Sequence, residues 1–96
     1  MTRFVLSPRA QSDLDEIWDY TAKNWGTEQA ALYLRQLETA IKSVAKAPGL
    51  GRSCDDIRMG YRKYPAGSHV IFFRLTGAGI EVIRILHRHM DFDRHV

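Results

Sequence analysis

Apolar residues recur at two different periods along the chain, and the change of period divides it into a helical part and an extended part. After a short apolar run at Arg3–Leu6, apolar residues come every three or four positions as far as Lys46. From Ile57 onward, apolar and polar residues alternate instead. A repeat of three to four residues is typical of one face of a helix, and alternation is typical of a strand with one buried face. The pattern therefore predicts a strand, then helices, then more strands.

Two helices are predicted before residue 47. Ser7 can accept a hydrogen bond from an early helical N–H, and Pro8 lacks only a donor that the first turn leaves unused. A helix should therefore begin here and run to about Asn24. Gly26 can adopt the left-handed conformation that ends a helix, and a second helix should follow from Glu28 to about Lys46. Because so few residues join them, the two helices should lie antiparallel as a hairpin.

The second half of the chain predicts three strands separated by glycine-containing turns. They are Ile57–Tyr64, Ser68–Thr76 and Ile80–His89. With the first apolar run, the element order is β-αα-βββ. We therefore expect a single α+β domain over residues 1–96, in which the antiparallel helical hairpin packs on one face of a mainly antiparallel four-stranded sheet.

The alternation also predicts which side chains of the last two strands lie under the helices. An odd-length turn at residues 77–79 would bring the richest apolar sets together. The predicted cross-strand pairs on the helix-covered face are Phe73 with Ile83, Ile71 with Ile85, and His69 with His87. The opposite face then mixes apolar with basic residues: Val70, Phe72, Arg74, Val82, Arg84, Leu86 and Arg88. Such a face is usually polar, so this mixed strip predicts a docking partner.

Composition narrows the class of protein only a little. A chain of 96 residues has room for one core, and a net charge of +3 favours acidic partners or nucleic acid. The fourteen basic residues are interspersed with eleven acidic ones, unlike the dense basic tract of a dedicated nucleic-acid-binding domain. Cys54 is the only cysteine, which excludes an internal disulfide and fits a reducing cytosol. No apolar run suggests a signal peptide or a membrane span.

Short motifs in a fixed order cover nearly the whole chain. They are Leu6-Ser7-Pro8-Arg9-Ala10, Leu14-Asp15-Glu16-Ile17, Gly51-Arg52, Gly60-Tyr61-Arg62-Lys63, Ile71-Phe72-Phe73-Arg74 and the ending from Ile83 to Asp91. Together with the element order, they resemble ParE toxins of the RelE/ParE toxin–antitoxin superfamily. The resemblance implies a cytoplasmic toxin that blocks DNA gyrase without a cofactor. It also implies a ParD-like antitoxin, whose ribbon-helix-helix dimer binds DNA and whose C-terminal segment wraps the toxin.

RelE-type relatives with the same fold cut messenger RNA on the ribosome, so a second function stays open. Metal-independent RNA cleavage needs acid and base groups together with cations around the phosphate. The candidates for these roles are Arg62, Arg74, Arg84 and His87. Residues 90–96 contain a phenylalanine and two aspartates but no tyrosine, which favours a toxin that binds its target and has no catalytic residues. An inert binding module retained with its antitoxin is a third possibility.

The resemblance and the mixed strip together suggest two groups of contact residues. The predicted antitoxin-binding residues are Trp18, Trp25, Val70, Phe72, Arg74, Val82, Arg84 and Leu86. The predicted target-binding residues are Arg88, His89, Met90, Asp91 and Arg94. Trp18 and Trp25 have an alternative role as core residues, because both lie on an apolar helical stripe.

Other side chains with chemical potential have simpler interpretations. His87 and His89 supply at most two well-placed ligands, even with Asp91, Asp93 and His95 nearby, so no metal site is predicted. His87 beside His69 is better interpreted as a structural pair. The acidic run Asp13, Asp15, Glu16 and Asp19 is expected to be a solvated helix face, and Cys54 is expected to be inert.

Overall fold

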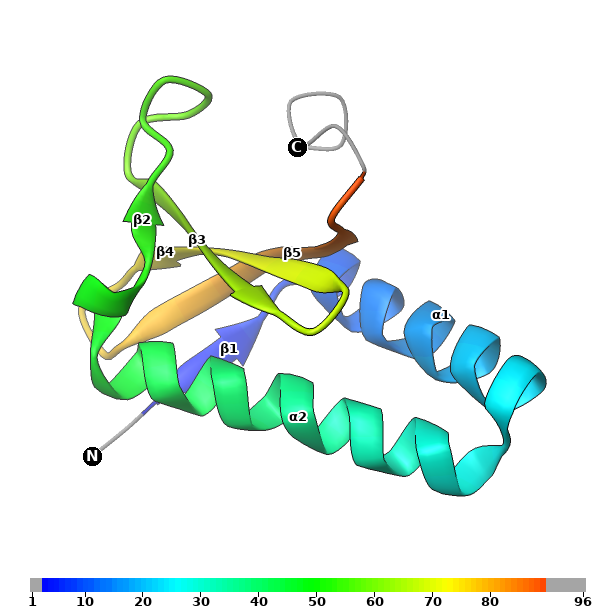
Figure 1. Ribbon diagram of the computed structural model, residues 1–96. Helices are drawn as coiled ribbons and strands as arrows, with labels where there is room; N and C mark the ends of the chain where they lie inside the picture. Colours follow the sequence, from blue (N-terminus) through cyan, green and yellow to red (C-terminus); the bar gives the residue numbers. More distant parts are fainter. Residues whose placement is uncertain (1–2, 90–96) are drawn as a thin grey trace.

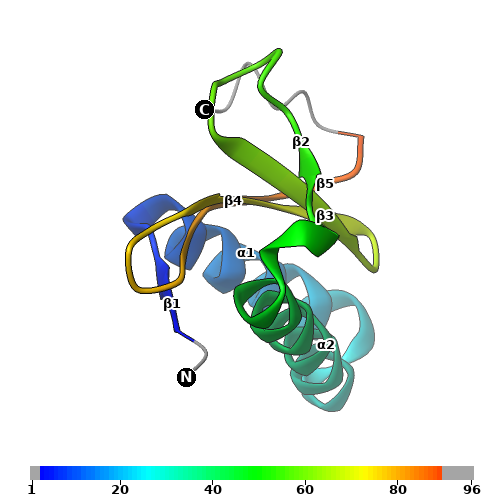
Figure 2. The same ribbon diagram turned by 90° about the vertical axis from the view of Figure 1, so that its left-hand side faces the viewer.

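The computed structural model describes residues 3–89 and confirms the predicted order of helices and strands (Figure 1). The elements are β1 Phe4–Leu6, α1 Pro8–Trp25, α2 Thr27–Lys46, the 3-10 helix η1 Pro48–Leu50, β2 Arg52–Ser53, β3 Tyr61–Ala66, β4 His69–Leu75 and β5 Ile80–His87. α1 and α2 form an antiparallel hairpin on one side of the sheet, as Figure 2 shows from a second direction. This is the α+β architecture expected from the sequence.

The sheet has five strands, in the order β1-β5-β4-β3-β2, where four were predicted. β1 runs parallel to β5, and the other neighbours are antiparallel. The additional strand β2 pairs Arg52 with Lys63 and Ser53 with Arg62. Both β2 residues are exposed, so no apolar alternation marked them within the predicted connector.

The second predicted strand, Ile57–Tyr64, corresponds to β3 and begins later than expected. Residues 57–60 form turns, in which the N–H groups of Ile57 and Arg58 both donate to the carbonyl oxygen of Cys54. The strand instead continues through Pro65 to Ala66, two residues beyond the predicted end. A proline is tolerated there because β2 pairs only with residues 62 and 63, which leaves that edge of Pro65 without a strand neighbour.

Two of the three predicted pairs between β4 and β5 are confirmed. His69 lies opposite His87, and Ile71 lies opposite Ile85, but Phe73 lies opposite Val82 instead of Ile83. The connector between Leu75 and Ile80 has four residues, and an irregularity between Phe72 and Phe73 inserts Ile83 as the extra residue of a β-bulge. Val82 is therefore fully buried under the helices, and its predicted place on the opposite face is wrong.

The main core lies between the helical hairpin and the sheet. Its fully buried large side chains include Leu37 and Val44 of α2 together with Ile71, Phe73, Ile80 and Val82 of the sheet. A second, smaller cluster on the opposite face joins Cys54, Phe72 and Leu86, with Tyr61 and Val70 packed against it. The predicted mixed strip is therefore not an open apolar surface, because the β2–β3 connection places Cys54 against Phe72 and Leu86.

The two tryptophans are not core residues. Trp18 is 37% exposed and Trp25 is 63% exposed, so the core interpretation of these residues is wrong. The buried residues of α1 are Ala10, Asp13, Ile17 and Thr21. Ile17 and Thr21 belong to the predicted apolar stripe, but Asp13 does not, because hydrophobicity alone gives no signal for a buried carboxylate.

Gly79 lies at a place where β1 and the β4–β5 connector leave no room for a side chain. A Cβ atom at this position would collide with the carbonyl oxygen of Arg3, which accepts a hydrogen bond from Ile80 N–H. We expect Gly79→Ala to lower the free energy of unfolding by about 1–3 kcal/mol, as overpacking does elsewhere. The matched control is Gly77→Ala in the same connector, where a Cβ meets nothing within 4 Å. Equal urea midpoints for the two variants would contradict this placement of β1.

Candidate functional site

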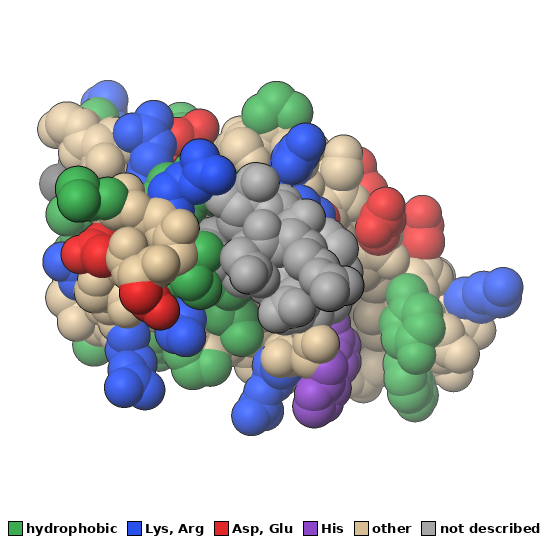
Figure 3. Space-filling view, turned by 90° about the horizontal axis from the view of Figure 1, so that it is seen from above, with side chains coloured by type: hydrophobic (Ala, Val, Ile, Leu, Met, Phe, Trp, Pro, Cys, Tyr) green, Lys and Arg blue, Asp and Glu red, His purple; other side chains and the backbone are tan. Residues whose placement is uncertain are grey.

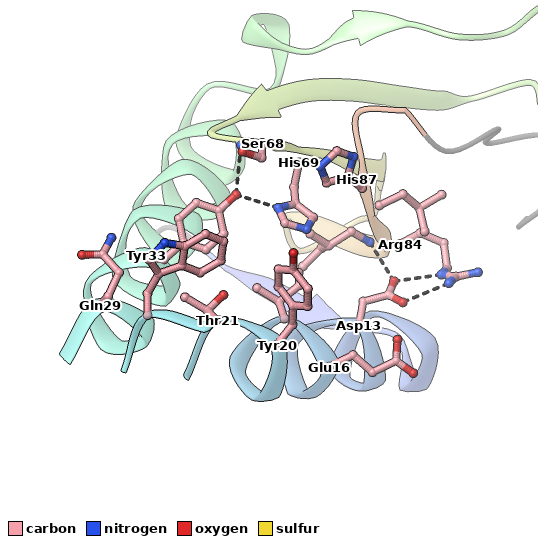
Figure 4. A pocket seen from close by; sticks show the side chains of 14 residues that line it. Asp13, Glu16, Tyr20, Thr21, Gln29, Tyr33, Ser68, His69, Arg84 and His87 are labelled. Carbon is pink, nitrogen blue, oxygen red and sulfur yellow. Dashed lines mark hydrogen bonds and ion pairs between the residues drawn. The ribbon is translucent and has the colours of Figure 1, made fainter. Parts of the chain in front are cut away.

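A cavity of about 550 Å³ opens between the helical hairpin and the part of the sheet where β4 begins and β5 ends (Figure 4). We call it the hairpin groove. Its lining residues are Asp13, Glu16, Ile17, Tyr20, Thr21, Trp25, Gln29, Tyr33, Ser68, His69, Arg84, Ile85, Leu86 and His87. The α1 contributions recur three or four residues apart and therefore share one face of the helix. The groove thus exists because one stripe of α1 faces the end of β5.

Asp13 fastens α1 to β5 at one end of the groove. Its carboxylate accepts hydrogen bonds from Arg84 Nε at 2.8 Å and from Arg84 Nη2 at 2.9 Å. The backbone N–H of Ile85 donates to the same carboxylate at 2.9 Å. The Asp13 hydrogen bond raises the pKa of Arg84, as expected for a charge-assisted bidentate pair. Asp13 is buried, so its interpretation as part of a solvated face is wrong.

Ser7 ties the beginning of the same helix to the bulge. Its Oγ accepts the N–H of Ala10 at 3.0 Å, which confirms the predicted N-cap, and donates to the carbonyl oxygen of Ile83 at 2.7 Å. The Ser7 backbone N–H donates to the carbonyl oxygen of Val82 at 2.9 Å. The capping residue therefore also satisfies the polar backbone that the bulge leaves at the edge of β5.

Tyr33 and His69 form a hydrogen-bonded pair deeper in the groove. The Tyr33 hydroxyl oxygen lies 2.6 Å from His69 Nδ1 and accepts the backbone N–H of Ser68 at 3.0 Å. Because the oxygen already accepts from Ser68, we assign its proton to the bond with Nδ1, which makes His69 a neutral acceptor. Burial, and then the nearby His87, lower the pKa of His69. His69 is half-buried, as expected for a structural residue, whereas His87 opposite it is exposed.

Two aromatic side chains at the rim of the groove are largely exposed. Tyr20 and Trp25 are each 63% exposed, and their ring centroids lie 5.8 Å apart in an edge-to-face arrangement. Trp25 was among the predicted contact residues, whereas Asp13, Tyr20 and Tyr33 were not. The spacing of Asp13, Ile17 and Tyr20 on one helical face was the signal that could have indicated two of them.

The predicted antitoxin-binding residues do not share one surface. Trp25, Arg84 and Leu86 line the hairpin groove, whereas Trp18 lines a separate cavity of about 320 Å³ bordered by β1 residues. Of the remaining residues, Val70 and Phe72 join Leu86 in the second cluster, Arg74 forms an ion pair with Glu81 at 2.7 Å, and Val82 lies in the main core. Val82 is too deeply buried to contact a partner.

The four candidate nuclease residues are also separated. Arg62 lies opposite Phe73, whose side chain is in the helix-covered core, and donates to the carbonyl oxygen of Gly51 at 3.2 Å. Arg74 follows Phe73 along β4 and therefore points to the other face. His87 lies opposite His69 at the groove, and Arg84 is held by Asp13. These side chains do not converge on a position that one phosphate group could occupy.

The predicted target-binding residues are only partly within the described chain. Arg88 and His89 are exposed, and Arg88 N–H extends the β4–β5 hairpin by donating to Ser68 at 3.0 Å. Met90, Asp91 and Arg94 lie outside the described residues. Within residues 3–89, no three or more histidine, cysteine or acidic side chains are placed to hold a metal ion. Burial raises the pKa of Cys54, which favours the uncharged thiol.

Charged side chains are distributed unevenly over the molecule. Exposed basic residues, among them Arg52, Arg58 and Lys63, lie on and around β2 and β3, whereas Asp15, Glu16 and Asp19 are exposed on α1. Figure 3 shows both regions from above, with acidic side chains beside hydrophobic ones at the α1 side. None of the helices in the described part of the chain is long and apolar enough to cross a membrane.

The helical hairpin packed on one face of a mixed five-stranded sheet defines a small α+β domain. A family model described as "ParE toxin of type II toxin-antitoxin system, parDE" matches residues 4–92. The chain therefore belongs to the ParE toxin family.

Known proteins resemble this chain over almost its whole length. Toxin ParE1 of Mycobacterium tuberculosis (strain H37Rv) is 54% identical over 96 residues, covering 99% of this chain and 98% of that protein. Toxin ParE1 of Caulobacter vibrioides is 45% identical over 96 residues, covering 100% and 99%. A solved structure entitled "Chromosomal ParDE TA system from P. aeruginosa" has a TM-score of 0.77 at 22% identity, covering 91% of this chain and 96% of that one. That structure has the same fold.

The Asp13–Arg84 pair should be strongly coupled, because each side chain is the main partner of the other. Removing one member of a buried ion pair leaves an uncompensated charge, so Asp13→Asn should lower the free energy of unfolding by about 3 kcal/mol. In a double-mutant cycle with Arg84→Gln, the coupling energy should be on the order of 1–3 kcal/mol. Asp19→Asn, at an exposed position of α1, is the control and should change stability by less than about 0.5 kcal/mol. Additive effects in the cycle would contradict the pairing.

His69 should make the folded state less stable in mild acid. Its pKa in the folded protein is below the ordinary value of 6.5, so the unfolded chain binds the proton more readily. Neutral His69 makes its full contribution to stability at pH values above the pKa that His69 has in the unfolded chain. This contribution is lost as the pH falls through the lower pKa that His69 has in the folded protein. Between about pH 7 and about pH 5, His69→Gln should therefore lose less stability in urea titrations than the unsubstituted protein. His89→Gln is the control, and an equal reduction in both variants would count against this role of His69.

Proposed function

We propose that this ParE-family chain is a growth-inhibiting toxin that binds DNA gyrase in the cytoplasm and has no catalytic residues of its own. Family membership is the observation that carries the proposal. The choice of gyrase follows from the resemblance of the sequence motifs to ParE toxins. Arg88, His89, Met90, Asp91 and Arg94 are the proposed target contacts.

The arrangement of the basic side chains supports binding in preference to RNA cleavage. A pentacoordinate phosphate needs several cations directed at one point, with an acid and a base beside it. Arg84 donates to Asp13, Arg74 donates to Glu81, and Arg62 donates to a backbone carbonyl on the other side of the sheet. Each of these interactions would have to be broken or shared before the side chains could act together on a phosphate.

The proposed partner is a ParD-like antitoxin with a ribbon-helix-helix domain, so that the toxin meets DNA only through the antitoxin. The family description, which names a type II toxin–antitoxin system, supports a protein partner. The hairpin groove is the proposed docking site for the antitoxin segment. It contains Trp25, Arg84 and Leu86 of the predicted contact residues, and exposed tryptophan and tyrosine side chains are frequent anchors of protein interfaces.

Supercoiling of relaxed plasmid by purified gyrase tests the proposed target. We expect the refolded toxin to inhibit supercoiling, and the double variant Arg88→Ala/His89→Ala to need a roughly tenfold higher concentration for the same inhibition, equivalent to about 1.4 kcal/mol of binding free energy. Arg52→Ala, which changes an exposed arginine at the other edge of the sheet, should inhibit like the unsubstituted toxin. Undiminished supercoiling at a large molar excess of toxin would refute the proposal.

Two further observations would identify the alternatives. Primer extension on translated messages after induction should show new ends within codons only if the chain is a ribosome-dependent nuclease. Normal growth on induction without an antitoxin would instead indicate an inert binding module.

A further inference from the structure

The hairpin groove presents three aromatic rings from separate parts of the helical hairpin. Tyr20 comes from α1, Trp25 from the end of α1, and Tyr33 from α2. The Tyr33 hydroxyl is already engaged by His69 and Ser68, so its ring is the part left to face a ligand. The exposed Tyr20–Trp25 pair contributes little to the core of this chain. An exposed aromatic pair beside a cavity is the kind of surface that a bound molecule covers.

The ionised side chains of the groove lining have a negative balance. Asp13 and Glu16 contribute two carboxylates, and Arg84 contributes the one guanidinium in the lining. Arg84 already donates two hydrogen bonds to Asp13, and His69 has a lowered pKa that favours its neutral form. In Figure 4, Glu16 and Tyr20 project from successive turns of α1, with Glu16 on the side of Asp13, which dashed lines join to Arg84. Glu16 is not a member of this bidentate pair, although its charge also raises the pKa of Arg84, and it is the carboxylate left to face a ligand.

Aromatic faces beside an available carboxylate are suited to a cation with an apolar stem. A guanidinium or ammonium group is attracted to aromatic faces within about 6 Å, and a carboxylate adds a charge-assisted hydrogen bond. Arginine and lysine also have apolar stems, which can pack on Ile17 and on the methyl group of Thr21. The cavity of about 550 Å³ is larger than one such side chain, so the occupant is a stretch of polypeptide. An acidic segment would instead bring like charges to Glu16.

We infer that the hairpin groove binds a partner polypeptide by packing an arginine or lysine side chain against the exposed Tyr20–Trp25 pair, with its charge directed to Glu16. This inference rests on the proposed function in one respect: the partner polypeptide is taken to be the antitoxin. The recognition of a cationic side chain belongs to the groove itself and can be measured without the antitoxin.

The direct test uses the full chain labelled with ¹⁵N and two small probes of nearly equal shape. N-acetyl-arginine amide carries the cation, and N-acetyl-citrulline amide replaces it with a neutral urea group. We expect saturable shifts of the Trp25 indole N–H with the arginine probe, at a Kd on the order of millimolar, and at least roughly fivefold weaker binding of the citrulline probe. The indole of Trp18, which lines the other cavity, is the internal reference. Equal responses to the two probes, no response, or equal shifts of both indoles would overturn the inference.

Three substitutions on α1 separate a built site from general attraction to acidic residues. Glu16→Gln removes the charge and Tyr20→Leu removes the ring, and each should weaken the arginine probe roughly fivefold. Asp19→Asn removes one exposed carboxylate of the same helix that does not line the groove, and it should leave the affinity unchanged. If Asp19→Asn weakens binding as much as Glu16→Gln, the probe follows the acidic face and the inference fails.

Two controls distinguish this inference from the proposed function and from self-association. A chain that inhibits gyrase but does not bind the arginine probe keeps the proposed function and loses the inference, and the reverse result does the opposite. Sedimentation of the toxin alone tests whether a second copy fills the groove through the basic residues around β3. A monomer supports a separate polypeptide partner. A dimer that Glu16→Gln dissociates would replace that partner with a second copy and overturn the inference as stated.

Discussion

The carboxylate of Asp13 pairs with a part of β5 that the shorter strand β1 does not reach. β5 extends from Ile80 to His87, but β1 pairs with it only from Ile80 to Val82. Beyond that point, the backbone of β5 would face the helical hairpin with unpaired donors, which are costly when buried. The Asp13 carboxylate accepts a hydrogen bond from the N–H of Ile85. Ser7 donates from its backbone N–H to the carbonyl oxygen of Val82 and from its hydroxyl to that of Ile83. α1 thus continues the pairing of β5 after β1 ends, and the opening between α1 and the end of β5 becomes the hairpin groove.

An apolar residue in place of Asp13 would change how α1 packs on β5, even if the free energy of unfolding stayed similar. Buried ion pairs can often be replaced by well-packed apolar side chains without loss of stability. An apolar side chain, however, cannot accept the N–H of Ile85, and an unsatisfied buried donor costs about 1–3 kcal/mol. The paired carboxylate also sets the rotation of α1 about its axis. That rotation directs Glu16 and Tyr20, three and seven residues later, into the groove.

Local patterns predicted the parts of this fold that local physics determines. The helical period, Ser7-Pro8 and Gly26 marked the two helices, and alternation placed His69 opposite His87. Parity could not identify the β-bulge, because Val82 and Ile83 are adjacent β-branched residues that suit either face. The choice between them depends on Ser7, whose hydroxyl reaches Ile83 from a distant part of the chain. The bulge also explains why an incorrect connector length still led to the correct pairs at Ile71 and His69.

The candidate site was less accessible from the sequence, for a related reason. Asp13, Asp15, Glu16 and Asp19 look alike in a linear sequence, and only the position where α1 crosses β5 makes one a buried partner and another a groove residue. The same applies to the arginines, since Arg74 and Arg84 were selected as contact residues from a strip that seemed open. Both are paired within the chain. The alternation of apolar and basic residues could not show which charges the fold pairs within the chain.

The same stripe of α1 serves both the fold and the surface, which links stability to recognition. Ile17 and Thr21 are buried, Asp13 holds the strand edge, and Glu16 and Tyr20 face the groove. A partner bound there contacts residues one helical turn from the main core and from the Asp13–Arg84 pair. Because such a partner binds only the folded chain, its binding free energy adds to the free energy of unfolding. An antitoxin bound in this groove would therefore stabilise the folded chain, and its release would leave the end of β5 held by Asp13 and Ser7.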